Sequence, residues 1–207
     1  TGDIVQNGRP GEYAHVRELL APLEAPLYII PGNRDDREAL RDAFSDHAYL
    51  PQTGEFLHYT IEDYLVRIVA LDSIVPGQRK GAFCGRRLAW LERVLEQAPG
   101  KPTLLLIHQP PFDIGTEYVG GYCRPGETEE LAAVVGRHPQ VQRLLCGHLH
   151  HPVHEHWGGT LATTMPSIAL DVRKGVDAGP VKDATMYQVH VMSGQAGLIS
   201  HTRIVTA

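Results

Sequence analysis

Cysteines, long apolar runs and excess positive charge are all scarce in this chain, and each shortage excludes a class of protein. The three cysteines are Cys84, Cys123 and Cys146, and their spacing fits neither a disulfide framework nor a thiolate zinc site. No apolar stretch approaches the ~20 residues that span a bilayer. The net charge is −5 and no tract gathers lysine and arginine, so a nucleic-acid partner is not expected. We predict a cytoplasmic protein without a membrane segment.

Length and composition indicate one domain that spans residues 1–207. Single domains commonly have ~50–250 residues. The hydrophobic share of 43% and the charged share of 21% are ordinary for a globular protein. No internal repeat, low-complexity linker or shift in composition divides the chain into two parts.

Hydrophobic periodicity predicts helices and strands that alternate, followed by a run of strands. Apolar residues at helical spacing predict helices over about 11–23 and 85–97, around Leu131 to Val135, and a short one around Leu40 and Phe44. Short apolar, β-branched or aromatic runs predict strands near 27–30, 56–61, 65–71, 103–107, 141–146, 154–157, 161–164, 185–192 and 197–205. This order indicates the α/β class, with mixed sheets in a sandwich.

Short polar motifs carry the candidate metal ligands. These motifs are Gly2-Asp3, Gly32-Asn33-Arg34-Asp35, His108 and Gly147-His148-Leu149-His150. Asn33, His108 and His148 each follow a predicted buried strand, and Asp3 opens a loop in the same way. Because open α/β sheets gather their ligands at the carboxyl ends of strands, we expect these side chains to converge. Alternation along a strand would put the rings of His148 and His150 on one side, although surface pairs of this kind also bind zinc or nickel adventitiously.

The residue types suit a pair of divalent cations. An aspartate can bridge two cations, imidazole binds zinc, iron or manganese, and an amide oxygen is a neutral hard ligand. Two metals ~3.5–4 Å apart can lower the pKa of a bridging water and hold a phosphoryl group during in-line displacement. The motifs therefore predict phosphate-ester hydrolysis with two divalent ions, which could be manganese, iron, zinc or cobalt.

The order of these motifs resembles that of the calcineurin-like metallophosphoesterases. Within that family, the chain is most similar to the bacterial class III cyclic nucleotide phosphodiesterases and the related glycerophosphodiesterases. The further sequences that carry this resemblance are Asn7-Gly8, Leu71-Asp72-Ser73, Val75-Pro76-Gly77, Leu88-Ala89-Trp90-Leu91 and Pro110-Pro111. The resemblance covers essentially the whole chain. It implies a four-layer α-β-β-α sandwich with two mixed sheets.

The resemblance also implies roles for individual residues. Asp3 would bridge both metals, Asn33, His108 and His148 would complete one metal site, and His150 would belong to the other. The family's opening Asp-x-His, on its first strand, supplies two further ligands, and no such motif precedes the first residue here. Either that strand is missing from this sequence or the chain holds one metal well and the other poorly. We favour the first alternative, because a core strand is rarely dispensable in a packed sheet.

Arg34 stands where the family usually has histidine, and with Asp35 it forms the candidate catalytic pair. Arginine stays protonated and cannot relay a proton, but its planar fork can hold a phosphate oxygen. We therefore predict that Arg34 positions substrate and that good leaving groups are preferred. Asp35 could equally begin the helix near 37 or pair with Arg34. Tyr118 and Tyr122 lie in a glycine-rich loop after His108 and are predicted to contact substrate.

The combined prediction is a metal-dependent phosphodiesterase that attacks a small-molecule diester with a metal-activated water. A phosphomonoesterase or a nuclease on the same scaffold is one alternative, and the acidic composition argues against the nuclease. A weakly active or inactive relative that binds a phosphate ligand is the other, favoured by the missing motif and by Arg34. Relatives that this chain resembles often form homodimers or larger homo-oligomers, so such an assembly is also implied.

Overall fold

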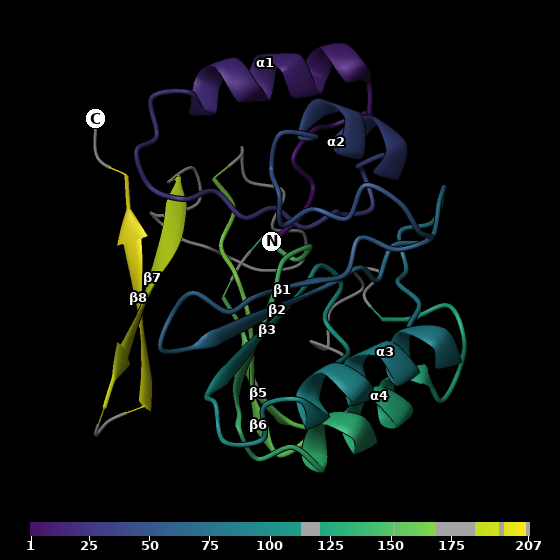
Figure 1. Cartoon of the computed structure of the whole chain (residues 1–207), viewed down its shortest axis with the longest axis vertical. Helices are drawn as coiled ribbons and strands as arrows, with labels where there is room; N and C mark the ends of the chain where they lie inside the picture. The colour runs from purple at the N-terminus through teal and green to yellow at the C-terminus, as the bar shows by residue number, and fades with distance from the viewer. Residues whose placement is uncertain (113–120, 151, 169–184, 195–196, 206–207) are drawn as a thin grey trace.

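A mixed six-stranded sheet forms the centre of the protein, with a separate two-stranded hairpin beside it (Figure 1). The computed structural model describes residues 1–112, 121–150, 152–168, 185–194 and 197–205. In sheet order, the large sheet contains β1 (Tyr59–Ile61), β2 (Arg67–Leu71), β3 (Thr103–Ile107), β4 (Val141–Cys146), β6 (Thr160–Thr164) and β5 (His154–Trp157). The helices are α1 (Pro10–Leu20), α2 (Arg37–Ala43), α3 (Gly85–Glu96) and α4 (Glu127–Gly136).

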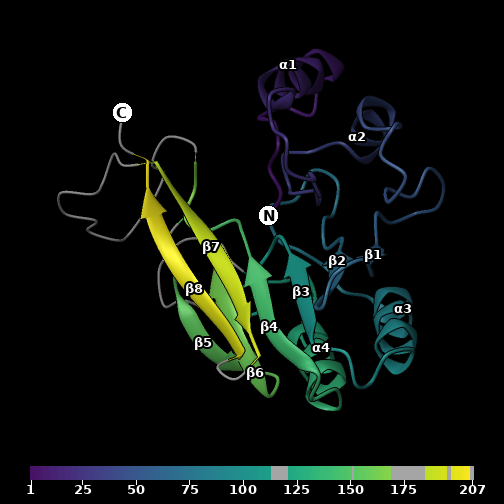
Figure 2. The same ribbon diagram turned by 60° about the vertical axis from the view of Figure 1, so that its left-hand side comes forward.

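The four inner strands run parallel, so their carboxyl ends meet at one edge of the sheet. β2 pairs with β3, β3 with β4 and β4 with β6 in parallel, while β1 and β5 close the two sides antiparallel. Ile107 pairs with Cys146 at the end of the β3–β4 ladder. One residue further on, the backbone N–H of Gly147 donates to the carbonyl of His108, 3.0 Å away. The ladder therefore places both predicted ligand loops side by side, and Figure 2 shows β3 and β4 pointing toward the N-terminal residues.

Both faces of the sheet are covered by apolar residues, because side chains alternate along each strand. On one face, β2 and β3 contribute Val69, Leu71, Leu105 and Ile107 to a core shared with α3 and α4. On the other face, Ile68, Ala70 and Leu106 pack with residues of α1, α2 and the segment before α2, among them Tyr13, Ile29 and Leu40. A strand that is buried on both sides reads as an uninterrupted apolar run, which is what the sequence shows at 103–107.

The hairpin of β7 (Met186–Ser193) and β8 (Gly197–Ile204) packs on the side of the sheet away from α3 and α4 (Figure 2). Arg143 of β4 donates to the hydroxyl of Ser200, 3.0 Å away, and to the carbonyl of Leu198, 3.1 Å away. Within the described residues, this hairpin is the whole of the second sheet. The α/β class and the mixed sheet are as predicted, whereas the second sheet has two antiparallel strands in place of the mixed sheet expected from the resemblance.

The predicted strand at 27–30 belongs to neither sheet. Ile29 and Ile30 are buried, as the apolar run requires. The backbone N–H of Ile29 donates to the hydroxyl of Tyr49 at 3.1 Å, and the hydroxyl of Tyr59 donates to the carbonyl of Ile29 at 2.7 Å. Tyrosine hydroxyls thus satisfy the polar backbone groups that a neighbouring strand would otherwise pair.

The helices are short. The first one ends at Leu20, three residues before the expected end, and α3 is the longest of the described helices with 12 residues. No helix in the described ranges has the length and apolar character needed to cross a membrane.

Candidate metal centre

Four of the predicted ligands meet beyond the ends of β3 and β4. One ligand atom from each of Asp3, His108 and His148 lies within 4.8 Å of the others. Around His108 Nε2, Asn33 Oδ1 is 3.1 Å away, His148 Nδ1 is 3.2 Å away and Asp3 Oδ1 is 3.5 Å away. The expected convergence of residues remote in sequence is therefore present in the structure.

A backbone carbonyl selects the tautomer of His108. Its Nδ1 lies 2.7 Å from the carbonyl oxygen of Thr1, which can only accept, so Nδ1 carries the proton and donates. In the neutral ring, Nε2 then presents a lone pair toward Asp3 and Asn33, whose oxygens are also acceptors. Acceptors that face one another repel unless a cation lies among them. Two oxygens and two imidazole nitrogens form a donor set that fits zinc, iron or manganese, and the carbonyl behind His108 is the outer partner that ligating histidines commonly have.

A glycine directly precedes three of the ligands, Asp3, Asn33 and His148, and close packing requires it there. A Cβ on Gly2 would lie 2.4 Å from His108 Nδ1, and one on Gly32 would lie 2.2 Å from the backbone nitrogen of Asp3. On Gly147 it would lie 2.3 Å from a backbone oxygen. The loops can approach this closely only without side chains at these positions, so the glycines allow the ligands to converge.

Left-handed backbone conformations occur at three of the predicted ligands. Asp3, His148 and His150 have φ of 54°, 70° and 61°, and they are the non-glycine residues with positive φ among those the structure describes. Such conformations cost ~1–3 kcal/mol each and cluster at functional sites. β4 ends at Cys146, so this loop, not strand alternation, orients both histidine rings. The prediction that strand alternation orients the two rings is therefore wrong. His150 is not one of the three residues whose ligand atoms lie within 4.8 Å of one another.

The carboxyl group of Asp3 is held in its ionised form. Burial by itself raises its pKa, but the positive charge of a protonated His108 ring and the hydrogen bond from the backbone N–H of Arg34, 2.8 Å from Oδ1, outweigh burial and lower the pKa below its usual value. The side chain of Asp3 remains 21% exposed, whereas that of His108 is 1% exposed. The group is therefore reached from solvent on the Asp3 side.

Asp35 holds the loops together. Its two oxygens accept hydrogen bonds from the backbone N–H groups of Ile4, Val5 and Gly32 at 3.1, 3.3 and 2.8 Å, and from the hydroxyl of Tyr13 at 3.0 Å. Burial raises the pKa of this carboxyl group above its usual value. Both oxygens thus have structural partners, and the catalytic role of Asp35 stays a prediction.

The other predicted residues occupy different positions. Asp36, not Asp35, caps the start of α2, and its carboxylate accepts a hydrogen bond from the backbone N–H of Ala39 at 2.9 Å. The side chain of Arg34 is exposed and makes no hydrogen bond or ion pair with the described residues. Tyr122 is buried, and its hydroxyl donates to the carbonyl of Gln109 at 3.1 Å, so the predicted substrate contact is wrong for this residue. Tyr118 lies outside the described residues.

Comparison with known proteins decides between the families that could use such a centre. Residues 1–152 match the calcineurin-like phosphoesterase family. The chain belongs to this family. It is 36% identical, over 99% of its length and 76% of the relative's, to a probable glycerophosphodiester phosphodiesterase of Arcobacter nitrofigilis.

A second relative is a 3′,5′-cyclic adenosine monophosphate phosphodiesterase of Escherichia coli, 33% identical over 84% of this chain. The chain spans 61% of that protein's length. A dimetal phosphatase from Danio rerio has a similar fold, with a TM-score of 0.59 and 16% identity over 93% of this chain and 76% of that one. The resemblance seen in the sequence is thus confirmed at the level of family and fold.

Proposed function

We propose that this chain is a metal-dependent phosphodiesterase that hydrolyses a small-molecule phosphodiester. The observation that carries this proposal is the meeting of acceptor atoms around His108 Nε2, which a divalent cation would satisfy. The names of the relatives, which describe a glycerophosphodiester and a cyclic nucleotide phosphodiesterase, support the same reaction class.

The four converging side chains would hold one divalent ion, and His150 is proposed to serve a second. Bound cations would supply Lewis acidity, which activates water and neutralises charge on the phosphoryl group. The Thr1 carbonyl keeps His108 in the tautomer that presents Nε2 to the site. The backbone N–H of Arg34 donates to Asp3 and keeps its carboxylate oriented.

The guanidinium of Arg34 is proposed to bind a non-bridging phosphate oxygen. It lines a pocket of about 540 Å³ together with Asn33, one of the four converging residues. Because arginine does not release its proton at working pH, it cannot protonate a departing alkoxide. Diesters with stable phenolate leaving groups should therefore react faster than alkyl diesters.

Metal removal and restoration test the proposal. Chelated protein should lose turnover of bis(p-nitrophenyl) phosphate and regain it with Mn²⁺, Fe²⁺, Zn²⁺ or Co²⁺, with metal content measured per chain. His108→Ala should lose both metal and turnover, whereas His15→Ala, on the exposed surface of α1, should retain both. Full turnover after chelation, or in His108→Ala, would overturn the proposal.

The same preparation separates the alternatives. Faster hydrolysis of p-nitrophenyl phosphate than of the diester would indicate a phosphomonoesterase, and metal binding without turnover would indicate a phosphate-binding relative. The cytoplasmic location and the homo-oligomeric state remain predictions. Sedimentation velocity measures the second directly.

A further inference from the structure

The pocket beside the metal centre is lined by charged and polar side chains together with Ile74, Pro76 and glycines. It runs from Asn33 and Arg34 past Arg37 and Glu55 to Ile74. Its volume of about 540 Å³ is within the range of small-molecule sites. None of the described residues that line it is aromatic. A planar base would find no aromatic stacking partner among them, whereas hydroxyl groups would find hydrogen-bond donors and acceptors.

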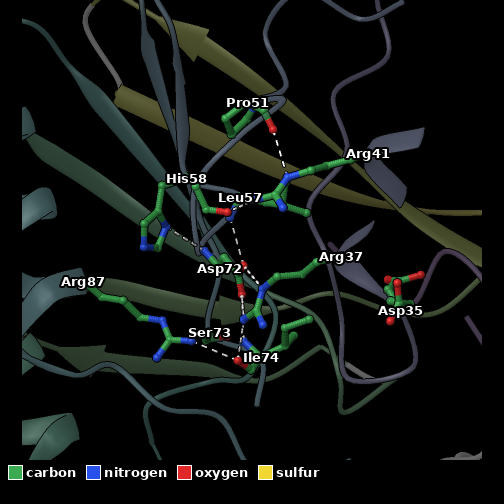
Figure 3. A network of polar contacts seen from close by, with 12 residues as sticks. Asp35, Arg37, Arg41, Pro51, Leu57, His58, Asp72, Ser73, Ile74 and Arg87 are labelled. Atoms are coloured by element: carbon green, nitrogen blue, oxygen red, sulfur yellow. Dashed lines mark hydrogen bonds and ion pairs between the residues drawn. The ribbon is translucent and has the colours of Figure 1, made fainter. Parts of the chain in front are cut away.

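Arg37 is fixed in the wall of this pocket by two groups behind it. Its Nε donates to Asp72 Oδ2 at 2.5 Å and its Nη2 to Asp72 Oδ1 at 2.8 Å. Nη2 also donates to the carbonyl of Ile74 at 2.6 Å (Figure 3). Nη1 has no partner among the described residues and is not enclosed by them. One edge of the guanidinium is thus anchored and the other edge is available to the pocket.

The anchor is a fully buried carboxylate. Asp72 also accepts hydrogen bonds from the backbone N–H groups of Leu57 and Ile74, each at 3.0 Å. Burial by itself raises the pKa of Asp72, but the Arg37 guanidinium outweighs burial and holds the pKa below its usual value. The ion pair therefore persists at neutral pH, and Arg37 is oriented before any ligand arrives.

The four acidic side chains of the pocket have partners other than Arg37. Asp35 and Asp36 accept from the backbone N–H groups of Gly32 and Ala39. Glu38 forms an ion pair with Arg41 at 2.5 Å, and Glu55 forms one with Arg86 at 2.5 Å. Carboxylates with one partner retain lone pairs that can accept from hydroxyl groups. The pocket wall thus offers a fixed donor and several acceptors.

We propose that Arg37 is a binding residue for one alcohol group of the diester, and that this pocket takes a hydroxylated, non-aromatic alcohol. Nη1 donates to an oxygen of that group while the phosphate lies at the metal centre near Arg34. The inference rests on the proposed function. It adds a residue whose role depends on Asp72, which is 35 positions further along the chain.

Two esters with the same leaving group test this inference. They are 2,3-dihydroxypropyl p-nitrophenyl phosphate and propyl p-nitrophenyl phosphate, which differ only in two hydroxyl groups. The metal-loaded native protein should show a higher kcat/KM for the dihydroxypropyl ester. In Arg37→Lys, the ammonium keeps a charge opposite Asp72 but cannot also reach into the pocket. The ratio of kcat/KM for the dihydroxypropyl ester to kcat/KM for the propyl ester should fall about tenfold, mainly through KM.

Arg87→Lys is the matched control. Arg87 donates to the same Ile74 carbonyl at 2.9 Å and lies against the Phe56 ring, but it does not line the pocket (Figure 3). This variant should affect both esters equally. Equal changes for both esters in Arg37→Lys, or no change, would overturn the inference.

The native comparison needs no variant and stands even if Arg37→Lys folds poorly. Equal kcat/KM for the two esters in the native protein would overturn the inference by itself. Failure of the metal-loaded native protein to hydrolyse the propyl ester or bis(p-nitrophenyl) phosphate would instead overturn the proposed function, so the two failures are distinguishable.

Discussion

Replacing Gly32 by alanine tests whether close packing of the loops holds the metal centre in place. The added methyl group would lie 2.2 Å from the backbone nitrogen of Asp3, 2.3 Å from its Oδ1 and 2.8 Å from His108 Cε1. Non-bonded carbon atoms are most favourably placed at ~3.5–4.0 Å. Asp3 must therefore move by about 1 Å, although no ligand atom has been removed.

The size of the effect follows from that displacement. A misplacement of about 1 Å can lower a rate by ~10²-fold. Overpacking commonly costs ~1–3 kcal/mol of stability. We expect Gly32→Ala to bind less metal, to lose about two orders of magnitude in kcat and to melt at a lower temperature. Metal analysis, steady-state kinetics with bis(p-nitrophenyl) phosphate and thermal denaturation measure these three changes.

Gly11→Ala is the control for this variant. Gly11 lies in α1, and a methyl group added there would have no atom within 4 Å, so alanine should stabilise the helix slightly and leave metal content unchanged. Native metal content and native kcat in Gly32→Ala would refute the argument that glycine is required for convergence.

Three further changes test the surroundings of the site. Asp35→Asn should destabilise the fold by ~1–3 kcal/mol in urea denaturation, because it weakens a carboxylate that accepts four hydrogen bonds. A loss of kcat without a loss of stability would instead support the predicted catalytic role of Asp35. The lowered pKa of Asp72 means that its stabilising contribution is present above the usual aspartate range and is lost as pH falls through the folded-state pKa. Asp72→Asn should therefore cost ~3–5 kcal/mol of stability at neutral pH, since Arg37 loses its counter-charge. The free energy of unfolding should then fall less steeply as the pH is lowered, and an unchanged acid dependence would contradict this. Arg34→His introduces a group with a pKa near ~6.5 and should narrow the rate gap between aryl and alkyl diesters, so an unchanged ratio across pH would count against the role given to Arg34.

The order of the elements and the ends of the central strands could be predicted from the sequence. The apolar run at 103–107 is β3, the run at 141–146 is β4, and the segments around Glu62-Asp63 form the antiparallel pair of β1 and β2. These elements have local signals, because strands buried on both faces are rich in apolar residues, as at Leu104 to Ile107 and Leu144 to Cys146. Since the carboxyl ends of neighbouring parallel strands lie side by side, the proximity of His108 and His148 could also be predicted.

Details that depend on partners remote in sequence could not be predicted. The segment 27–30 has the composition of a strand, but tyrosine hydroxyls bond its backbone. Tyr122 follows a glycine-rich stretch typical of a loop over a site, yet its ring is in the core. Asp35 looked catalytic from its motif, and only the approach of residues 4 and 5 shows that it bonds the loops together. In each case the deciding contact is made by a residue remote in sequence, which the local sequence does not reveal.

The sequence alone determined which residues could bind metal, their order along the chain and the strands that carry them, because side-chain chemistry and periodicity are local properties. Only the tertiary structure decided the tautomer of His108, which depends on a carbonyl 107 positions away, and the orientation of Arg37, which depends on Asp72. The physical reason is that a hydrogen bond or an ion pair is set by distances of about 3 Å in space, and separation along the chain does not determine those distances.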